Sequence, residues 1–202
     1  MKSEDKKRMS WMDVSLNQFN KLQDALKIED ETERTIAICE VIFGENVTDL
    51  PLSEFKDKAK ELAFLGEEIP QMTPPKTINI HGKKYKVDCL LGRISTAQYV
   101  DYINHMKGNE MNKMLSVFLI PDGHKYNDGY DMLEVFNDID DLPIPIVNGC
   151  AFFFENQYRL FMRIFQRYSK RSIRKTKLPK GMKKAMEQVV DSSVDMVLSP
   201  IS

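Results

Sequence analysis

The chain has 202 residues, of which 42% are hydrophobic and 29% are charged, and its formal net charge is −1. These values are ordinary for a soluble globular protein and exclude a chain that is disordered throughout. The longest apolar runs are about ten residues, well below the roughly 20 that a membrane-spanning helix needs, so we expect no membrane segment.

The N-terminal end reads as a charged leader. Residues 1–10 lack the apolar core that a secretory signal carries behind its charges, so we expect synthesis in the cytosol and a mobile segment here. Trp11 is the only tryptophan, and we expect it to pack beside the first helix.

One local pattern occurs twice. Ser15 with Gln18, and Ser95 with Gln98, have the spacing of a capping box, in which each side chain bonds the backbone N–H of the other residue. Each serine is therefore expected to begin a helix. The apolar positions that follow also correspond between the two copies: Phe19, Leu22 and Leu26 match Tyr99, Tyr102 and Met106. We interpret the pattern as a divergent internal duplication; a chance resemblance between two helix starts is the alternative.

Residues 11–69 are predicted to form a small helical unit. The apolar pattern over residues 15–65 indicates three helices. Gly44 is expected to end the second helix, and Asp49 is expected to cap the third. The first half of the chain is therefore expected to be helical.

Residues 70–93 are predicted to be a connector followed by a β-hairpin. Three prolines at positions 70–75 prevent regular structure there, so we place the domain boundary in this stretch. Residues 76–80 and 85–87 alternate apolar and polar side chains around a glycine-containing turn at 81–84, which is typical of a hairpin.

Residues 94–176 are predicted to be a second helical unit. Within it, residues 114–120 fit a helix and a strand equally, because the run is short, apolar and partly β-branched. A long amphipathic helix with a basic outer face is expected from Asn148 onward. Residues 177–202 are expected to be a flexible tail, with a short helix followed by disorder. The predicted fold is mainly α (α+β), with two related helical units joined by the proline-rich connector and the hairpin.

The charges are distributed unevenly. Eleven basic residues and no acidic residue lie between Asn156 and Met186, whereas an acidic stretch precedes them, comprising Asp128, Asp131, Glu134, Asp138, Asp140 and Asp141. The basic segment fits a solvated helix face, an acidic protein partner or nucleic acid. The slightly negative net charge and the absence of a base-reading motif favour the first two.

No pattern in the sequence indicates an enzyme. His81, His105 and His124 are isolated, without the spacing of a metal site, and the acidic residues after Asp122 lack the ligand order of a calcium loop. A phosphate-binding loop and a nucleophile elbow are also absent. The cysteines, which fit buried reduced thiols, are Cys39, Cys89 and Cys150. We therefore assign no catalytic, cofactor-binding or metal-binding residue and expect no cofactor.

Three aromatic residues, Phe152, Phe153 and Phe154, follow one another in the long helix. Such residues usually belong to a core. Three consecutive side chains cannot all face inward on one helix, so part of this cluster could meet a partner.

Several of these segments resemble small proteins encoded among the tail genes of bacteriophages, which are often tail assembly chaperones. The resemblance covers residues 11–170 and rests on Trp11 before residues 14–19, on residues 50–55, on the hairpin at 78–87 and on residues 94–101. No catalytic residue comes with this family.

The resemblance implies that the protein binds the helical tape measure protein in the host cell cytoplasm, shields its apolar stripes and releases it as the tail polymerises. On this hypothesis the apolar contacts come from Phe152, Phe153, Tyr158, Phe161 and Phe165. The contacts to acidic partner residues come from Arg163, Arg167, Arg171 and Arg174.

Two other functions stay open. In the first, the protein is a virion subunit of a ring or connector, and the negative middle of one copy meets the positive end of its neighbour in a homo-oligomer. In the second, residues 159–184 bind nucleic acid.

Overall fold

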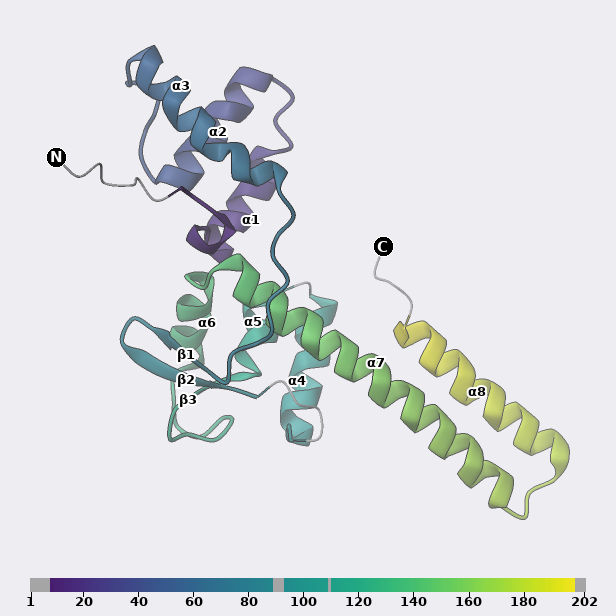
Figure 1. Ribbon diagram of the computed structural model, residues 1–202. Coiled ribbons are helices and arrows are strands. Elements are labelled where there is room, and N and C mark those ends of the chain that lie inside the picture. Colours follow the sequence, from purple (N-terminus) through teal and green to yellow (C-terminus); the bar gives the residue numbers. More distant parts are fainter. Residues whose placement is uncertain (1–7, 89–92, 109, 199–202) are drawn as a thin grey trace. The chain divides into compact units, whose positions relative to one another are not determined.

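The computed structural model describes residues 8–88, 93–108 and 110–198 (Figure 1). The chain is mainly helical with one small antiparallel sheet, which confirms the predicted class. The elements in chain order are η1 Trp11–Asp13, α1 Leu16–Ala25, α2 Glu31–Phe43, α3 Leu52–Glu61, η2 Leu62–Gly66, β1 Thr77–Ile80, β2 Lys83–Val87, α4 Thr96–Lys107, α5 Met111–Ser116, β3 Leu119–Pro121, α6 Met132–Asp140, α7 Ile144–Lys175 and α8 Lys180–Leu198.

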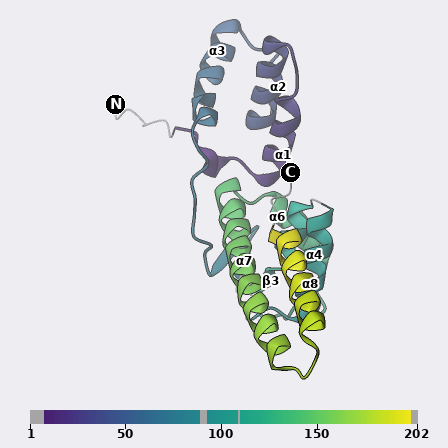
Figure 2. The same cartoon turned by 90° about the vertical axis from the view of Figure 1, so that its right-hand side faces the viewer.

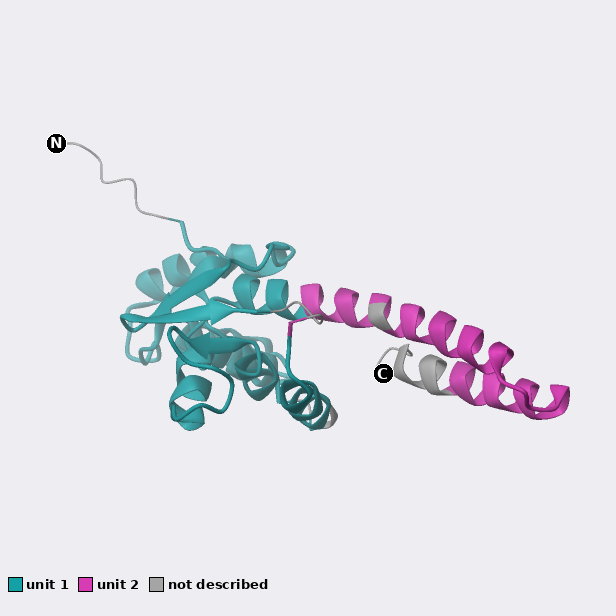
Figure 3. Ribbon diagram, turned by 90° about the horizontal axis from the view of Figure 1, so that it is seen from below, with its two compact units in different colours: residues 1–89, 94–151 teal, residues 90–93, 152–202 magenta. Residues whose placement is uncertain are grey.

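The chain forms two compact units (Figure 3). Unit 1 consists of residues 1–89 and 94–151, and unit 2 consists of residues 90–93 and 152–202. Helix α7 begins in unit 1 and continues into unit 2. The predicted boundary at the proline-rich connector therefore does not separate the units, because the segments on both sides of it belong to unit 1.

A short backbone bridge explains why these segments stay together. The N–H of Leu16 donates to the carbonyl of Leu142, and the N–H of Ile144 donates to the carbonyl of Val14, both at 2.9 Å. All four of these residues are buried. The start of α1 is thus paired with the start of α7, a contact between segments more than 120 residues apart in the sequence.

The connector also packs on α7. A Cβ atom on Gly149 would lie 2.4 Å from the carbonyl oxygen of Met72, a distance that no real Cβ contact shows. Only glycine allows this approach without a shift of the backbone. The connector is therefore held against the first turns of α7, and the proline-rich stretch belongs to the structure of unit 1.

Trp11 packs beside α1, as predicted, and also against η2. Its ring lies edge-on to Phe19 and Phe64, with centroid distances of 6.2 and 5.5 Å. Its indole N–H donates to the carbonyl of Glu67 at 3.0 Å, and Arg8 pairs with the Glu67 carboxylate. Part of the expected mobile leader is therefore tied down, from Arg8 onward.

Both predicted capping boxes are present. In α1 and in α4 the serine accepts from the glutamine N–H at 3.2 Å, and the glutamine accepts from the serine N–H. Gly44 ends α2 with a positive φ of 69°, as expected. The predicted cap of α3 is wrong, because Pro51 occupies that position and the Asp49 carboxylate accepts from Asn46 instead.

The sheet begins as the predicted hairpin. Strands β1 and β2 pair with Ile78 opposite Tyr85, and the turn is made by His81 and Gly82, both with positive φ. Strand β3 pairs with β2, with Leu119 opposite Val87. The ambiguous segment 114–120 thus contains both structures, since α5 ends at Ser116 and β3 begins at Leu119.

The C-terminal region differs from the expectation beyond Pro179. Residues 177–202 were expected to be a flexible tail, but α8 is a helix of 19 residues. It lies alongside α7 within unit 2 (Figure 2). Two ion pairs join the helices, Lys170 to Asp191 at 2.6 Å and Arg174 to Glu187 at 2.9 Å. Disorder was expected because the segment is close to the chain end, but α8 is stabilised by these ion pairs with α7.

Candidate functional site

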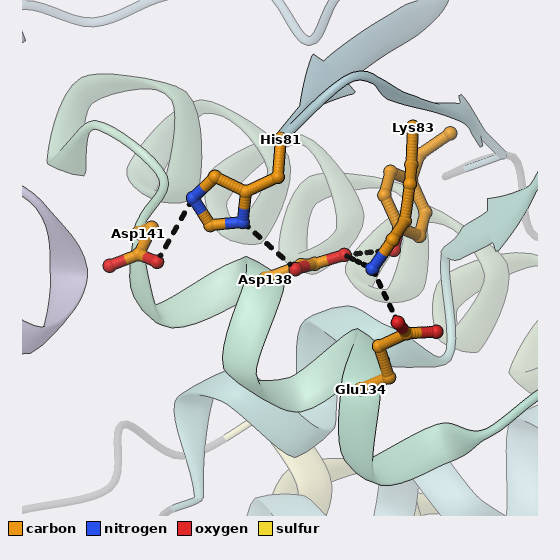
Figure 4. Close-up of polar contacts among 6 residues, drawn as sticks. His81, Lys83, Glu134, Asp138 and Asp141 are labelled. Atoms are coloured by element: carbon orange, nitrogen blue, oxygen red, sulfur yellow. Dashed lines mark hydrogen bonds and ion pairs between the residues drawn. The ribbon is translucent and has the colours of Figure 1, made fainter.

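Two groups of side chains are candidate functional sites. The first is a polar cluster between the hairpin and α6 (Figure 4). The alternation of β2 places Lys83 and Tyr85 on one face of the strand, and His81 precedes them in the turn. Helix α6 and its C-cap contribute carboxylates at positions i, i+4 and i+7, which share one helix face. These carboxylates are Glu134, Asp138 and Asp141.

Asp138 is the centre of this cluster, and its side chain is only 6% exposed. It accepts hydrogen bonds from the Tyr85 hydroxyl, from Lys83 Nζ at 3.2 Å and from His81 Nδ1 at 3.1 Å. Burial alone would raise the pKa of the Asp138 carboxyl, but hydrogen bonds from Tyr85, His81 and Lys83 outweigh burial and hold the pKa below its ordinary value. Burial and the bond to Asp138 raise the pKa of Tyr85.

His81 joins two carboxylates. Its Nδ1 faces Asp138, and its Nε2 lies 3.3 Å from Asp141 Oδ2. Lys83 makes the corresponding second link, to Glu134 at 2.6 Å. Each basic side chain of the hairpin tip therefore bridges two acidic groups on α6.

The cluster is best described as a clamp that fastens the hairpin tip to α6. A general base needs a nitrogen or oxygen that is open to a substrate, but both His81 nitrogens and the Asp138 carboxylate are already engaged. Among the residues that the structure describes, no group of three or more His, Cys, Asp and Glu side chains is placed to hold a metal ion. We therefore treat these residues as structural.

Most residues of the acidic stretch are engaged within unit 1, half of them in the clamp. Glu134, Asp138 and Asp141 bind the hairpin, and Asp131 caps α6 by accepting from the Leu133 N–H at 2.8 Å. Asp140 is partly buried with a hydrogen bond to Asn112. The acidic side chains that are clustered in the sequence are therefore mostly engaged in hydrogen bonds and ion pairs within unit 1.

The second group lies on α7 within unit 2. The predicted contact residues divide between its interior and its surface. Tyr158 is buried and stacks with Phe154 at 6.3 Å, so the structure places it in the interior, against the prediction of a surface contact. Phe152 and Phe165 are about half exposed, and Phe153 is intermediate. The Phe161 side chain lies outside the described residues.

A row of exposed apolar side chains was not assigned to the site from the sequence. Leu160, Ile164 and Tyr168 are 53%, 55% and 72% exposed. They are spaced four residues apart and thus follow one side of the helix. This spacing is the signal in the sequence that could have identified them. Each lies three residues before one of the arginines assigned to the site, namely Arg163, Arg167 and Arg171.

The arginines also divide into two sets. Arg163, Arg167 and Arg171 are exposed, and they take part in none of the ion pairs among the side chains that the structure describes, which leave out residues 193–198 of α8. Arg174, which was predicted to belong with them, pairs instead with Glu187 of α8. Arg159 pairs with Glu155 at 2.7 Å, one turn away. An apolar row and a basic row thus run next to each other along α7. We call these six residues the double row.

Helix α8 adds apolar surface of its own. Met182 and Met186, one turn apart, are 53% and 41% exposed. Methionine side chains are flexible and adapt to varied partner surfaces. Unit 2 therefore exposes apolar side chains on both of its helices.

Comparison of the chain with protein families, with curated proteins and with solved structures finds no match. None of the helices in the described residues is long and apolar enough to cross a membrane. The cysteines that can be placed, Cys39 and Cys150, are buried and outside any disulfide, whereas Cys89 lies outside the described residues.

Proposed function

We propose that this protein is a non-enzymatic binding protein whose unit 2 covers a helical segment of another protein. The observation that carries the proposal is the double row, in which Leu160, Ile164 and Tyr168 stay exposed on a helix. Exposed apolar rows of this kind are typical of surfaces that bind an amphipathic helix.

The proposed partner is the tape measure protein of a bacteriophage tail, which makes the protein a tail assembly chaperone acting in the host cell cytoplasm. The phage setting rests on the sequence resemblance over residues 11–170. A long helical partner exposes apolar stripes before the tail tube surrounds it. Unit 2 exposes apolar side chains one turn apart along α7, a surface on which an apolar stripe of a second helix packs.

A feature of unit 1 supports the proposed internal duplication. The side-chain amide of Gln18 donates to the carbonyls of Val41 and Ile42, at the end of α2. The amide of Gln98 donates to the carbonyl of Val117, just after α5. Each glutamine thus caps its own helix and also bonds the end of the next one. A chance resemblance of two helix starts would not require this second bond.

Co-expression with the tape measure protein tests the proposed function. We expect the wild-type chain to co-purify with the tape measure protein and to raise its soluble yield. The triple variant L160S/I164S/Y168S should lose both effects, because burial of the apolar row drives association. A matched control, L52S/V100S/L133S, changes three exposed apolar residues of unit 1 and should bind normally. A wild-type chain that leaves the tape measure protein insoluble contradicts the proposal.

The location of the protein distinguishes a chaperone from a virion subunit. Mass spectrometry of lysate and of purified particles should find a chaperone in the lysate alone. A fixed ratio to the other particle proteins would favour the ring or connector subunit instead.

A further inference from the structure

We infer that the helix bound by the double row is acidic, with carboxylates about four residues apart beside its apolar row. The carboxylates pair with Arg163, Arg167 and Arg171, and the apolar side chains pack on Leu160, Ile164 and Tyr168. This inference rests on the proposed function, since it specifies the chemistry of the segment that unit 2 binds.

Within unit 2, acidic side chains pair with some of the basic side chains and not with others. Glu187 and Asp191 of α8 neutralise Arg174 and Lys170, and Glu155 neutralises Arg159. Among the side chains that the structure describes, with residues 193–198 left out, no carboxylate pairs with the three arginines of the double row. They are one turn apart, so their guanidinium groups can meet carboxylates that repeat at the same interval on a second helix.

Two other sources of negative charge fit the double row less well. Nucleic acid would neutralise the arginines, but its phosphates would leave the apolar row beside them uncovered. In a second copy of this chain, the acidic stretch is already engaged, because Glu134, Asp138 and Asp141 bind the hairpin of their own unit. An acidic amphipathic helix of another protein satisfies both rows of the surface.

The test uses the full chain and fluorescently labelled synthetic helices of about 20 residues, long enough to span the double row. One peptide carries leucine on one face and glutamate at every fourth position beside it. A second has glutamine in place of each glutamate, and a third has lysine. A DNA duplex of roughly 20 base pairs serves as the competing anion. Fluorescence anisotropy measures the affinity of each probe.

We expect the glutamate peptide to bind about tenfold more tightly than the glutamine peptide, as three partly exposed ion pairs allow. The difference should shrink as salt rises from roughly 0.05 to 0.5 M, because added salt screens exposed charges. Equal affinities for the glutamate and glutamine peptides, or tighter binding of the duplex, would overturn the inference.

Reversing the charge of the three arginines tests whether they cause the preference for the glutamate peptide. The variant R163E/R167E/R171E should lose the preference for the glutamate peptide and bind the lysine peptide more tightly than wild type does. The control K177E/K180E/K184E makes the same change in net charge at three exposed lysines away from the double row and should keep the preference. A control that loses the preference as fully as the arginine variant means that general charge is responsible, which overturns the inference.

The outcome is distinguishable from a failure of the proposed function. If the tape measure protein co-purifies with wild type and with R163E/R167E/R171E equally, the partner binds without the arginines and only the inference fails. If the tape measure protein never co-purifies, the proposed function fails, whatever the peptides show.

Discussion

Asp138 shows how much of unit 1 depends on one side chain. Its carboxylate receives hydrogen bonds from Tyr85, Lys83 and His81, and Tyr85 is 1% exposed. If the carboxylate is removed, the buried Tyr85 hydroxyl loses its acceptor, which is costly because water cannot replace it. The acidic residue is conspicuous in the sequence only as one member of a charged stretch.

We therefore expect Asp138→Asn to lower the free energy of unfolding by about 2 to 3 kcal/mol at neutral pH, because the amide presents a donor to groups that also donate. Urea unfolding followed by Trp11 fluorescence measures the change. The control Asp128→Asn alters an exposed carboxylate in the same stretch and should have little effect.

The same pair of proteins gives a pH dependence of known sign. Because folding lowers the pKa of Asp138, its ionised form contributes stability above the ordinary carboxyl pKa of about 3.9 and loses it as pH falls through the lower folded value. The difference between wild type and Asp138→Asn should thus shrink below about pH 4. A difference that grows on acidification would contradict this assignment.

At the scale of elements, the capping glutamines do more than begin helices. Gln98 is 5% exposed, accepts from the Ser95 N–H at 2.8 Å and donates to the Val117 carbonyl at 2.8 Å. Its two functions are separable, because one uses the side-chain oxygen and the other uses the nitrogen. The second bond fixes the start of α4 against the end of α5.

Gln98→Glu tests this second function, since it keeps the capping oxygen but sets a carboxylate oxygen against the Val117 carbonyl. We expect a loss of about 2 to 3 kcal/mol at neutral pH, against about 1 kcal/mol for Ser95→Ala, which removes the cap alone. Chemical denaturation of both variants provides the measurement. Equal losses would mean that Gln98 acts only as a cap.

At the scale of the whole molecule, the two units differ in how much apolar surface they bury. Unit 1 has an extensive core that includes Trp11, Phe64, Phe118 and Ile139. Among the side chains of unit 2 that the structure describes, the buried apolar ones are Phe154, Tyr158, Met162 and Ile173. A helical pair with so small a core is expected to be less stable than a domain of the size of unit 1.

We therefore expect two transitions on heating. The helical circular dichroism signal should decrease in both transitions. The fluorescence of Trp11, which lies in unit 1, should change only in the transition at higher temperature. Binding of an acidic helix should raise the temperature of the first transition, since a ligand stabilises the folded form that binds it. One coincident transition by both probes would show that the units unfold together.

The sequence by itself determined the features that depend on neighbours a few residues away. The capping boxes at Ser15 and Ser95, the glycine at the end of α2, the hairpin around Gly82 and the long basic helix all follow from local backbone preferences and apolar periodicity. For these features, the residue types at neighbouring positions are enough to predict the local structure.

Only the tertiary structure decided which distant residues meet. The bridge between Val14 and Ile144, the approach of Met72 to Gly149 and the clamp on Asp138 each join segments at least 50 residues apart. These contacts place the predicted domain boundary inside unit 1 and occupy the acidic stretch. Within unit 2, Tyr158 is buried and Arg174 pairs with Glu187 of α8, while the double row stays exposed. A linear pattern shows which face a residue occupies, but burial and pairing depend on the element that packs against that face.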